Sequence, residues 1–167
     1  MNQQVVETDI AVVGAGGCGL TASLVAAGLG KRVLLLERAD EVGGSTAMSA
    51  GIFVAAGSQL QLANGESGTA EELAADILRL NDGQSDAGVT MALCRASGPL
   101  MDWLVAKGVP LEHMPVYRYP GMSRAWMLSP PQRHGLVITD VLLRKVREQP
   151  NIDLRLRTRV TGLTTAG

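Results

Sequence analysis

The hydrophobic positions near the start of the chain fall into two short apolar runs separated by one longer segment. Residues 10–13 read Ile-Ala-Val-Val, four apolar positions that predict a short β-strand. Small and apolar residues then extend over positions 17–28, the length of a helix, and a second apolar run follows at 33–36. Because such a run is typical of a parallel strand covered on both faces, this order predicts a β-α-β unit.

Helical patterns fill the middle of the chain. The polar, glycine-bearing segment 58–68 predicts a loop, and Thr69 with Glu72 then forms a capping box that starts a helix. A second helix is expected over residues 87–107, with a break or kink at Gly98-Pro99. The residues predicted to form the apolar side of this second helix are Leu93, Ala96, Leu100, Trp103 and Leu104.

The last third of the chain changes from irregular to regular patterns. The proline-rich segment 110–131 predicts neither regular helix nor central strand, and forms either a loop bordering a substrate cavity or an irregular surface excursion. A helix is expected after Gly135, and residues 152–160 alternate between apolar and charged positions as a strand does. The order of elements predicts an α/β fold, a Rossmann-like domain with a parallel sheet flanked by helices.

Composition narrows the class of protein. A hydrophobic content of 46% with 19% charged residues is typical of a globular domain, and 167 residues suffice for one domain with a sizeable core. A formal net charge of −1 and 3% aromatic residues argue against nucleic acid as a partner, and no apolar run is long enough for a membrane helix. Residues 1–4 lack signal-peptide features, so the expected location is cytoplasmic. Cys18 and Cys94 indicate neither a disulfide framework nor a metal site.

The connection between the first strand and the first helix carries the most specific signal. Residues 14–19 read Gly-Ala-Gly-Gly-Cys-Gly, the G-x-G-x-x-G turn that places a pyrophosphate at a helix N-terminus. Gly14 permits the tight turn, Gly16 lets the backbone approach the phosphates, and Gly19 allows helix and strand to pack closely. Glu37 ends the second strand, at the spacing where a carboxylate binds the ribose hydroxyls and would repel a 2′-phosphate. The unit therefore predicts an adenine dinucleotide without a 2′-phosphate, either NAD or FAD.

A second run of small residues, at positions 43–52, favours FAD over NAD. A domain that binds NAD does not need another glycine pair and four more small residues beyond its second strand, whereas a domain that binds a longer cofactor does need such a segment. Small residues let the backbone run beside the cofactor, and the hydroxyls of Ser45, Thr46 and Ser49 can hydrogen-bond to its polar edge.

Three pieces of the sequence, GAGGCG, LLLERADEVGGSTAMSAG and RVTGL, together carry a family resemblance. The chain resembles the FAD-dependent oxidoreductases of the fumarate reductase/succinate dehydrogenase flavoprotein type, which include 3-ketosteroid dehydrogenases. The resemblance implies that residues 43–52 follow the pyrophosphate, ribityl chain and flavin ring, with Thr46 and Ala47 near the reactive edge, and that the backbone at Val160 contacts the adenine. The residues expected to bind FAD are Gly14, Ala15, Gly16, Gly17, Cys18, Gly19, Glu37, Arg38, Gly43, Gly44, Ser45, Thr46, Ala47, Ser49, Ala50, Gly51, Ile52 and Val160.

The resemblance also implies how the flavin is attached. Membrane-bound respiratory members of the family carry a histidine in this segment that bonds covalently to the flavin. Here Ser45 is followed directly by Thr46, and neither His113 nor His134 is nearby in the sequence. FAD is therefore expected to be held non-covalently.

The resemblance extends over nearly the whole chain, but it covers only the N-terminal part of the longer sequences of the family members. Residues 1–167 are interpreted as the N-terminal portion of an FAD-binding domain, incomplete at its C-terminus and without the capping and substrate domain. Such a chain is expected to be a truncated product, an isolated domain or one piece of a split protein. An incomplete sheet would leave an unpaired edge, which favours self-association.

The predicted function is that of the FAD-binding portion of an oxidoreductase acting on a carbon–carbon bond next to a carbonyl or carboxylate. A small-molecule substrate is expected only if the missing portion completes the protein, because the sequence assigns no catalytic residue. The alternative is a truncated, non-catalytic nucleotide-binding fragment. A NAD-binding module is disfavoured by residues 43–52.

Overall fold

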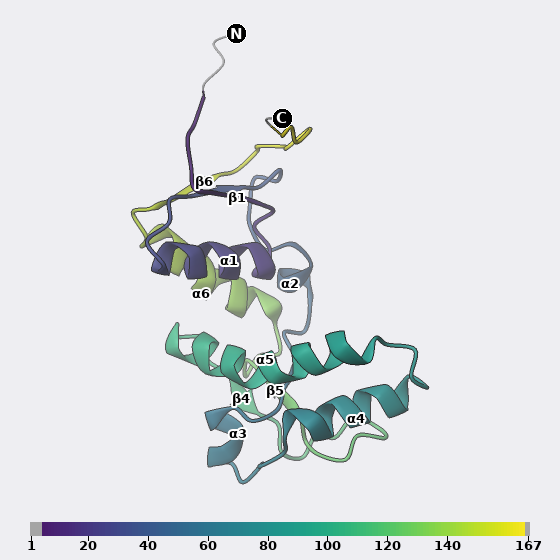
Figure 1. Cartoon of the computed structure of the whole chain (residues 1–167). Coiled ribbons are helices and arrows are strands. Elements are labelled where there is room, and N and C mark those ends of the chain that lie inside the picture. Colours follow the sequence, from purple (N-terminus) through teal and green to yellow (C-terminus); the bar gives the residue numbers. More distant parts are fainter. Residues whose placement is uncertain (1–4, 166–167) are drawn as a thin grey trace. The chain divides into compact units, whose positions relative to one another are not determined.

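The chain forms two compact units (Figure 1). The computed structural model describes residues 5–165, so the absence of signal-peptide features at residues 1–4 lies outside the described residues. The first unit contains the chain up to Ser49 and from Leu136 onward, and the second contains Ala50–Gly135.

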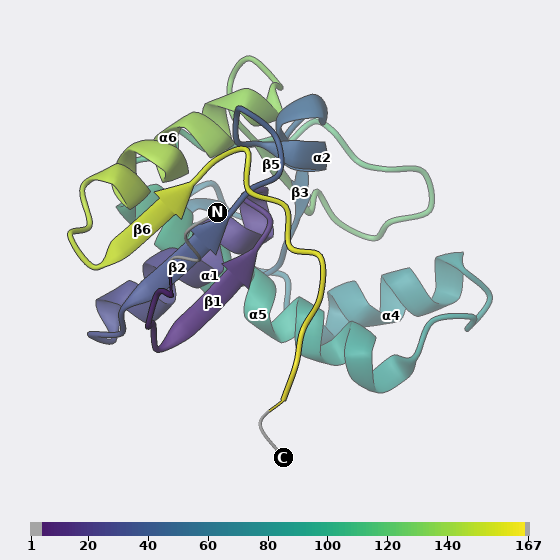
Figure 2. The same cartoon turned by 90° about the horizontal axis from the view of Figure 1, so that it is seen from above.

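The first unit is built on a parallel sheet with strand order β1-β2-β6. Its strands are β1 (Ile10–Val13), β2 (Val33–Leu36) and β6 (Ile152–Arg155), and its helices are α1 (Gly17–Gly28), the short α2 (Gly44–Met48) and α6 (Gly135–Arg147). Helices α1 and α6 lie on the same face of the sheet (Figure 1 and Figure 2). The predicted α/β fold, a parallel sheet flanked by helices, is confirmed.

Strand β2 is the central strand of this sheet, but only one of its faces is fully buried. Val33 and Leu35 are buried, and Val33 packs against Ala26 and Ala27 of α1. The residues of the opposite face, Leu34 and Leu36, are half-buried. A strand covered on both faces was expected. Within residues 5–165, only the face of β2 that is turned toward α1 is fully covered.

Strand β6 is shorter than the alternating pattern of residues 152–160 predicts. The strand ends at Arg155, and Arg157 adopts a left-handed backbone with φ of 52°. The N–H groups of Arg157 and Thr158 instead donate to the carbonyls of Ala39 and Glu37, each at 2.8 Å. These two bonds hold the segment after β6 beside the end of β2.

The second unit combines three helices with a small antiparallel sheet of strand order β3-β5-β4. Its elements are β3 (Phe53–Val54), α3 (Gln59–Ala63), α4 (Ala70–Leu80), α5 (Ala87–Ala106), β4 (Glu112–His113) and β5 (Met127–Ser129). Its core comprises Ala56, Leu73, Ala74, Cys94 and Trp126. The predicted capping box at the start of α4 is confirmed, because Thr69 Oγ1 accepts the Glu72 N–H and the Glu72 carboxylate accepts the Thr69 N–H.

Two predictions of irregular structure in this unit are wrong. Residues 58–68 contain α3, because Ser58 Oγ accepts the Gln61 N–H at 3.2 Å and the Gln61 side chain accepts the Ser58 N–H, a second capping box. The proline-rich segment 110–131 contains β5, the central strand of the sheet. The strand ends at Ser129, directly before Pro130, so no proline interrupts its ladder of hydrogen bonds.

Of the break or kink predicted in α5, the break is wrong. The helix continues through Gly98-Pro99, and a Cβ atom on Gly98 would overlap the Ala56 carbonyl oxygen. Glycine at this position therefore permits close packing. The predicted apolar side is displaced as well, since Leu93 is 67% exposed. The buried residues of the helix are Thr90, Cys94, Gly98, Met101 and Leu104.

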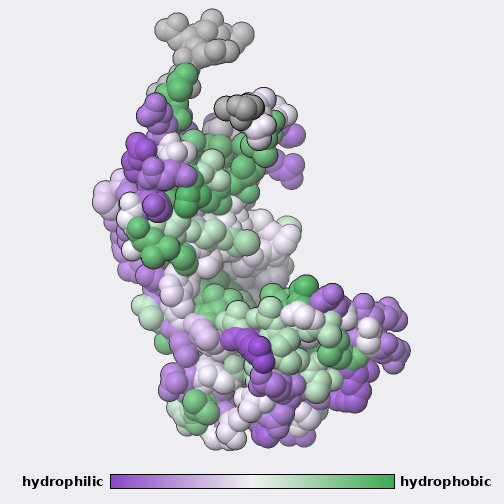
Figure 3. Space-filling view, viewed as in Figure 1, coloured by the Kyte–Doolittle hydropathy of each residue, from purple (hydrophilic) through white to green (hydrophobic). Residues whose placement is uncertain are grey.

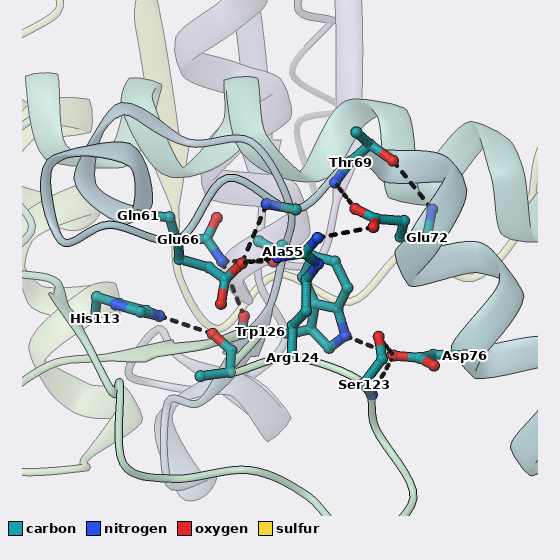
Figure 4. A network of polar contacts seen from close by, with 12 residues as sticks. Ala55, Gln61, Glu66, Thr69, Glu72, Asp76, His113, Ser123, Arg124 and Trp126 are labelled. Atoms are coloured by element: carbon teal, nitrogen blue, oxygen red, sulfur yellow. Dashed lines mark hydrogen bonds and ion pairs between the residues drawn. The ribbon is translucent and has the colours of Figure 1, made fainter.

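A buried carboxylate, Asp76 of α4, organises the loop that precedes β5 (Figure 4). One of its oxygens accepts hydrogen bonds from Trp126 Nε1 at 2.8 Å and from the N–H and hydroxyl of Ser123 at 2.7 Å, and the other pairs with Arg79 at 2.7 Å. Burial by itself would raise the pKa of Asp76, but the hydrogen bonds from Trp126, Ser123 and Arg79 outweigh it and hold that pKa well below its usual range. Beside it, Arg124 forms ion pairs with Glu66 and Glu72.

None of the helices in the described part of the chain is both long and apolar enough to cross a bilayer.

Candidate cofactor site

The turn between β1 and α1 has the backbone geometry that its glycines predict. Gly14 has φ of 98°, a left-handed conformation that favours glycine. A Cβ atom on Gly19 would overlap the Gly14 carbonyl oxygen, so only glycine allows the helix to approach the strand this closely. In contrast, a Cβ atom on Gly14 would meet nothing within 4 Å, and one on Gly16 would meet only the Gly43 carbonyl oxygen, at 3.6 Å. Open space therefore lies in front of the turn.

The N-terminus of α1 faces this turn without a side-chain cap of its own. Its N-cap residue is Gly16, which has no side chain to accept the unpaired N–H groups of the first turn. One of these groups, the Gly17 N–H, donates to Thr46 Oγ1 of α2 at 3.3 Å. The Gly43 N–H donates to the Ala15 carbonyl at 3.0 Å, which fixes the start of α2 beside the turn. A helix N-terminus in this setting favours an anion.

Glu37 reaches the same turn from the end of β2. Its Oε2 atom accepts the Ala15 N–H at 2.7 Å and its Oε1 atom accepts the Ala39 N–H at 2.9 Å. These two backbone hydrogen bonds, that of Ala15 first, lower the pKa of Glu37 from its ordinary value. The site therefore presents an ionised carboxylate next to the glycine turn at neutral pH, as ribose recognition requires.

A cavity of about 410 Å³ in the first unit is lined by residues from several segments of the chain, some of which were predicted to bind FAD. Six predicted residues line it: Gly14, Gly16, Glu37, Arg38, Gly44 and Val160. Four lining residues were missed by sequence reasoning: Val13, Leu36, Thr158 and Arg159. Val13 and Leu36 end parallel strands, and the carboxyl ends of such strands meet at the edge where ligands bind, a signal that could have found both.

The other predicted residues lie outside the lining of this cavity. Ser45, Thr46 and Ala47 lie on α2, and Ser49 follows the helix and donates from its hydroxyl to the Thr46 carbonyl at 2.8 Å. Ala15 and Gly17 lie within the turn, and Gly43 directly precedes α2. Cys18 is exposed in the first turn of α1. The structure does not bring Ala50, Gly51 and Ile52 into this unit, because they begin the second one.

Comparison with known proteins identifies the family. The model of the FAD binding domain family matches residues 9–167 of the chain. The chain belongs to this family. FAD is thus the cofactor, and the residues present fit it, because the open space at Gly14 and Gly16 leaves room for a pyrophosphate beside the carboxylate of Glu37.

Relatives of this FAD-binding domain include reductases. It is 35% identical to urocanate reductase of Eggerthella lenta over 102 residues, 61% of this chain and 17% of that protein. It is 28% identical to a fumarate reductase (cytochrome) of Shewanella frigidimarina over 151 residues, 90% of this chain and 26% of that protein. Its structure matches the open conformation of a flavocytochrome c3 fumarate reductase with a TM-score of 0.83 and 30% identity, over 95% of this chain and 28% of the other. The chain thus spans about a quarter or less of the length of these curated relatives.

No cluster of three or more histidine, cysteine or acidic residues that could hold a metal ion occurs within residues 5–165.

Proposed function

We propose that this chain is the cytoplasmic FAD-binding portion of an oxidoreductase that acts on a carbon–carbon bond next to a carbonyl or carboxylate, and that it holds FAD non-covalently. The observation that carries the proposal is the convergence of the glycine turn, the ionised Glu37 and Gly44 on one cavity. The relatives named for the reduction of fumarate and urocanate support the reaction class, because both compounds hold a carbon–carbon double bond conjugated to a carboxylate. When bound, FAD supplies the hydride chemistry.

The residues of this chain bind and orient the cofactor. The N–H groups at the start of α1 would hold the pyrophosphate, since Gly16 lets the backbone come close to it. Glu37 would accept hydrogen bonds from the ribose hydroxyls while Ala15 and Ala39 keep its carboxylate in place. A small-molecule substrate and the groups that protonate it would belong to the remainder of a longer protein, since this chain spans only 17% and 26% of the urocanate and fumarate reductases it resembles.

The first experiment asks whether the purified chain retains FAD. The chain is incubated with FAD, desalted, and its flavin absorbance is measured; a parallel sample receives NAD. We expect flavin to be retained at about one equivalent, and acid precipitation to leave it in the supernatant because no covalent bond holds it.

Each other outcome of this experiment has a defined meaning. Binding of NAD alone would overturn the assignment to FAD, and flavin in the protein pellet would overturn non-covalent attachment. Bleaching of the retained flavin by an added saturated acid or ketone would show turnover by this chain alone. Retention without bleaching would agree with an FAD-binding portion whose substrate groups lie elsewhere, and equally with the alternative, a non-catalytic nucleotide-binding fragment.

We also propose that the chain self-associates through the outer edge of β1. In the described part of the chain β1 pairs with β2 alone, and the strand is apolar and exposed, with Val13 61% exposed. Hydrophobic surface is visible on the part of the molecule that holds this sheet (Figure 3). Such an edge offers unpaired N–H and C=O groups to a second strand. The opposite edge strand, β6, carries Asp153 and Arg155, which protect it.

The substitution Ala11→Lys should shift the chain toward monomer, because it places a charge on this edge at an exposed position outside the cavity lining. Light scattering after size exclusion, at increasing protein concentration, measures the shift. Val25→Lys, on the exposed side of α1, controls for added charge. A wild-type chain that stays monomeric at every concentration would disprove the proposal.

A further inference from the structure

Three arginines alternate along the segment that includes and follows β6, and they differ in their partners. Arg155 pairs with Asp153 at 2.8 Å, and Arg157 pairs with Asp40 at 3.7 Å. Among the residues of the described structure, the side chain of Arg159 has no ion pair or hydrogen bond, yet Arg159 lines the cofactor cavity. A strand over residues 152–160 would place the three arginines on one side, whereas the structure separates Arg159 from the other two by its lack of a partner and its place on the cavity wall.

Two other polar side chains of the cavity wall, those of Glu37 and Thr158, already form hydrogen bonds. Both carboxylate oxygens of Glu37 accept backbone N–H groups, and the hydroxyl of Thr158 donates to the Leu156 carbonyl at 2.9 Å. The remaining lining residues are glycines, the apolar residues Val13, Leu36 and Val160, and a second arginine, Arg38, which directly follows Glu37. Arg159 therefore adds a planar cation with free donors on the segment after β6, whereas Arg38 lies next to Glu37 at the end of β2.

The order of the wall segments indicates which part of a dinucleotide Arg159 would meet. A pyrophosphate belongs at the N-terminus of α1, and the adjoining ribose belongs at Glu37. The Thr158 N–H donates to the Glu37 carbonyl, so residues 158–160 continue the wall directly beyond the ribose position. The group that follows the ribose in the ligand is the base.

Resting on the proposed function, we propose that Arg159 is a specificity-determining residue that recognises the adenine of FAD by placing its guanidinium plane against the base. A guanidinium stacks on aromatic rings, and such contacts are strengthened where the ligand excludes water. Lysine carries the same charge without the plane, so the two side chains are not equivalent here.

The test compares Arg159→Ala, Arg159→Lys and the matched control Arg155→Ala, whose arginine pairs with Asp153 away from the cavity lining. Binding of FAD and of ADP to the cofactor-free chain is measured by calorimetry at low and high salt. We expect Arg159→Ala to weaken both ligands about tenfold, with a similar loss at both salt concentrations. Arg159→Lys should restore little of that loss, and Arg155→Ala should bind as the wild type does.

The outcomes separate this inference from the proposed function. A wild-type chain that binds neither FAD nor ADP would contradict the proposed function. Wild-type binding with an unchanged Arg159→Ala variant would overturn the inference alone. A loss that Arg159→Lys restores, or that vanishes at high salt, would also overturn it, because long-range attraction of an anion by the charge would then explain the effect. An equal loss in Arg155→Ala would overturn it in the same way.

Discussion

The substitution Gly16→Ala is expected to weaken FAD binding about 100-fold while the chain stays folded. The added methyl group would project into the open space in front of the turn, where it holds a phosphate away from the N–H groups of α1. Hydrogen bonds to a charged group contribute about 1.5–3 kcal/mol each, so losing one or two accounts for this factor. Titration of the cofactor-free chain with FAD, followed by calorimetry, measures it.

The structure explains why this substitution separates binding from folding. Gly16 has φ of −78°, which any residue adopts, and the added Cβ would lie at an ordinary contact distance, 3.6 Å, from the Gly43 carbonyl oxygen. Gly28→Ala is the matched control, because it adds the same methyl group at the far end of α1 where nothing lies within 4 Å. Unchanged FAD affinity in Gly16→Ala would show that the phosphates do not bind at this turn.

The substitution Asp76→Ala is expected to destabilise the second unit by about 3–5 kcal/mol, the usual cost of removing one partner from a buried charged network. The residue is 4% exposed, and its removal would leave the buried Trp126 N–H and the donors of Ser123 without an acceptor. Both tryptophans of the chain, Trp103 and Trp126, lie in this unit. Tryptophan fluorescence during urea unfolding therefore reports its stability.

Two further variants test whether the network of Asp76 is responsible. Asp76→Asn keeps the shape but loses the charge and one acceptor, so its stability should fall between wild type and Asp76→Ala. Glu71→Ala removes an acid from the same helix whose ion pair with Arg95 is exposed, and it should change the unfolding midpoint little. Equal midpoints for Asp76→Ala and Glu71→Ala would contradict a special role for the buried carboxylate.

The same network predicts how stability depends on pH. The pKa of Asp76 is lowered in the folded chain relative to its unfolded value of about 3.9, so the ionised group stabilises the fold above that pH. This contribution is lost as the pH falls below about 4 toward the folded pKa. Wild type should therefore lose its advantage over Asp76→Ala in acid, which unfolding curves between pH 6 and pH 3 would show.

The fold of the first unit was predictable because its signals are local. The apolar run at residues 33–36 predicts a strand, and it forms β2. The glycines of residues 14–19 predict the turn, because the lack of a side chain permits the left-handed φ at Gly14 and the close packing at Gly19. Glu37 follows at a fixed spacing along the same unit, and the structure turns it back onto Ala15. The family pattern extended these signals to Val160, which lies on the cavity wall.

Errors arose where distant segments decide the outcome. The side of α5 that is buried was predicted from apolar residues alone, but Gly98 packs against Ala56, so Thr90, Cys94 and Gly98 are buried while Leu93 is exposed. The central position of β5 depends on pairing with β3, more than 70 residues earlier in the chain. Neither partner can be recognised from the periodicity of the segment itself.

The sequence by itself determined the β-α-β unit, its glycine turn and its cofactor class, because each depends on residues close together along the chain. Only the tertiary structure decided that Arg159 joins the cavity wall while Arg155 does not, and that Asp76 is buried against Trp126, 50 residues further on. From the pattern of neighbouring residues alone, a charged residue is predicted to be exposed to solvent. Whether such a residue is exposed to solvent depends on which hydrogen-bond donors and cavity-lining residues, distant in the sequence, the fold places beside it.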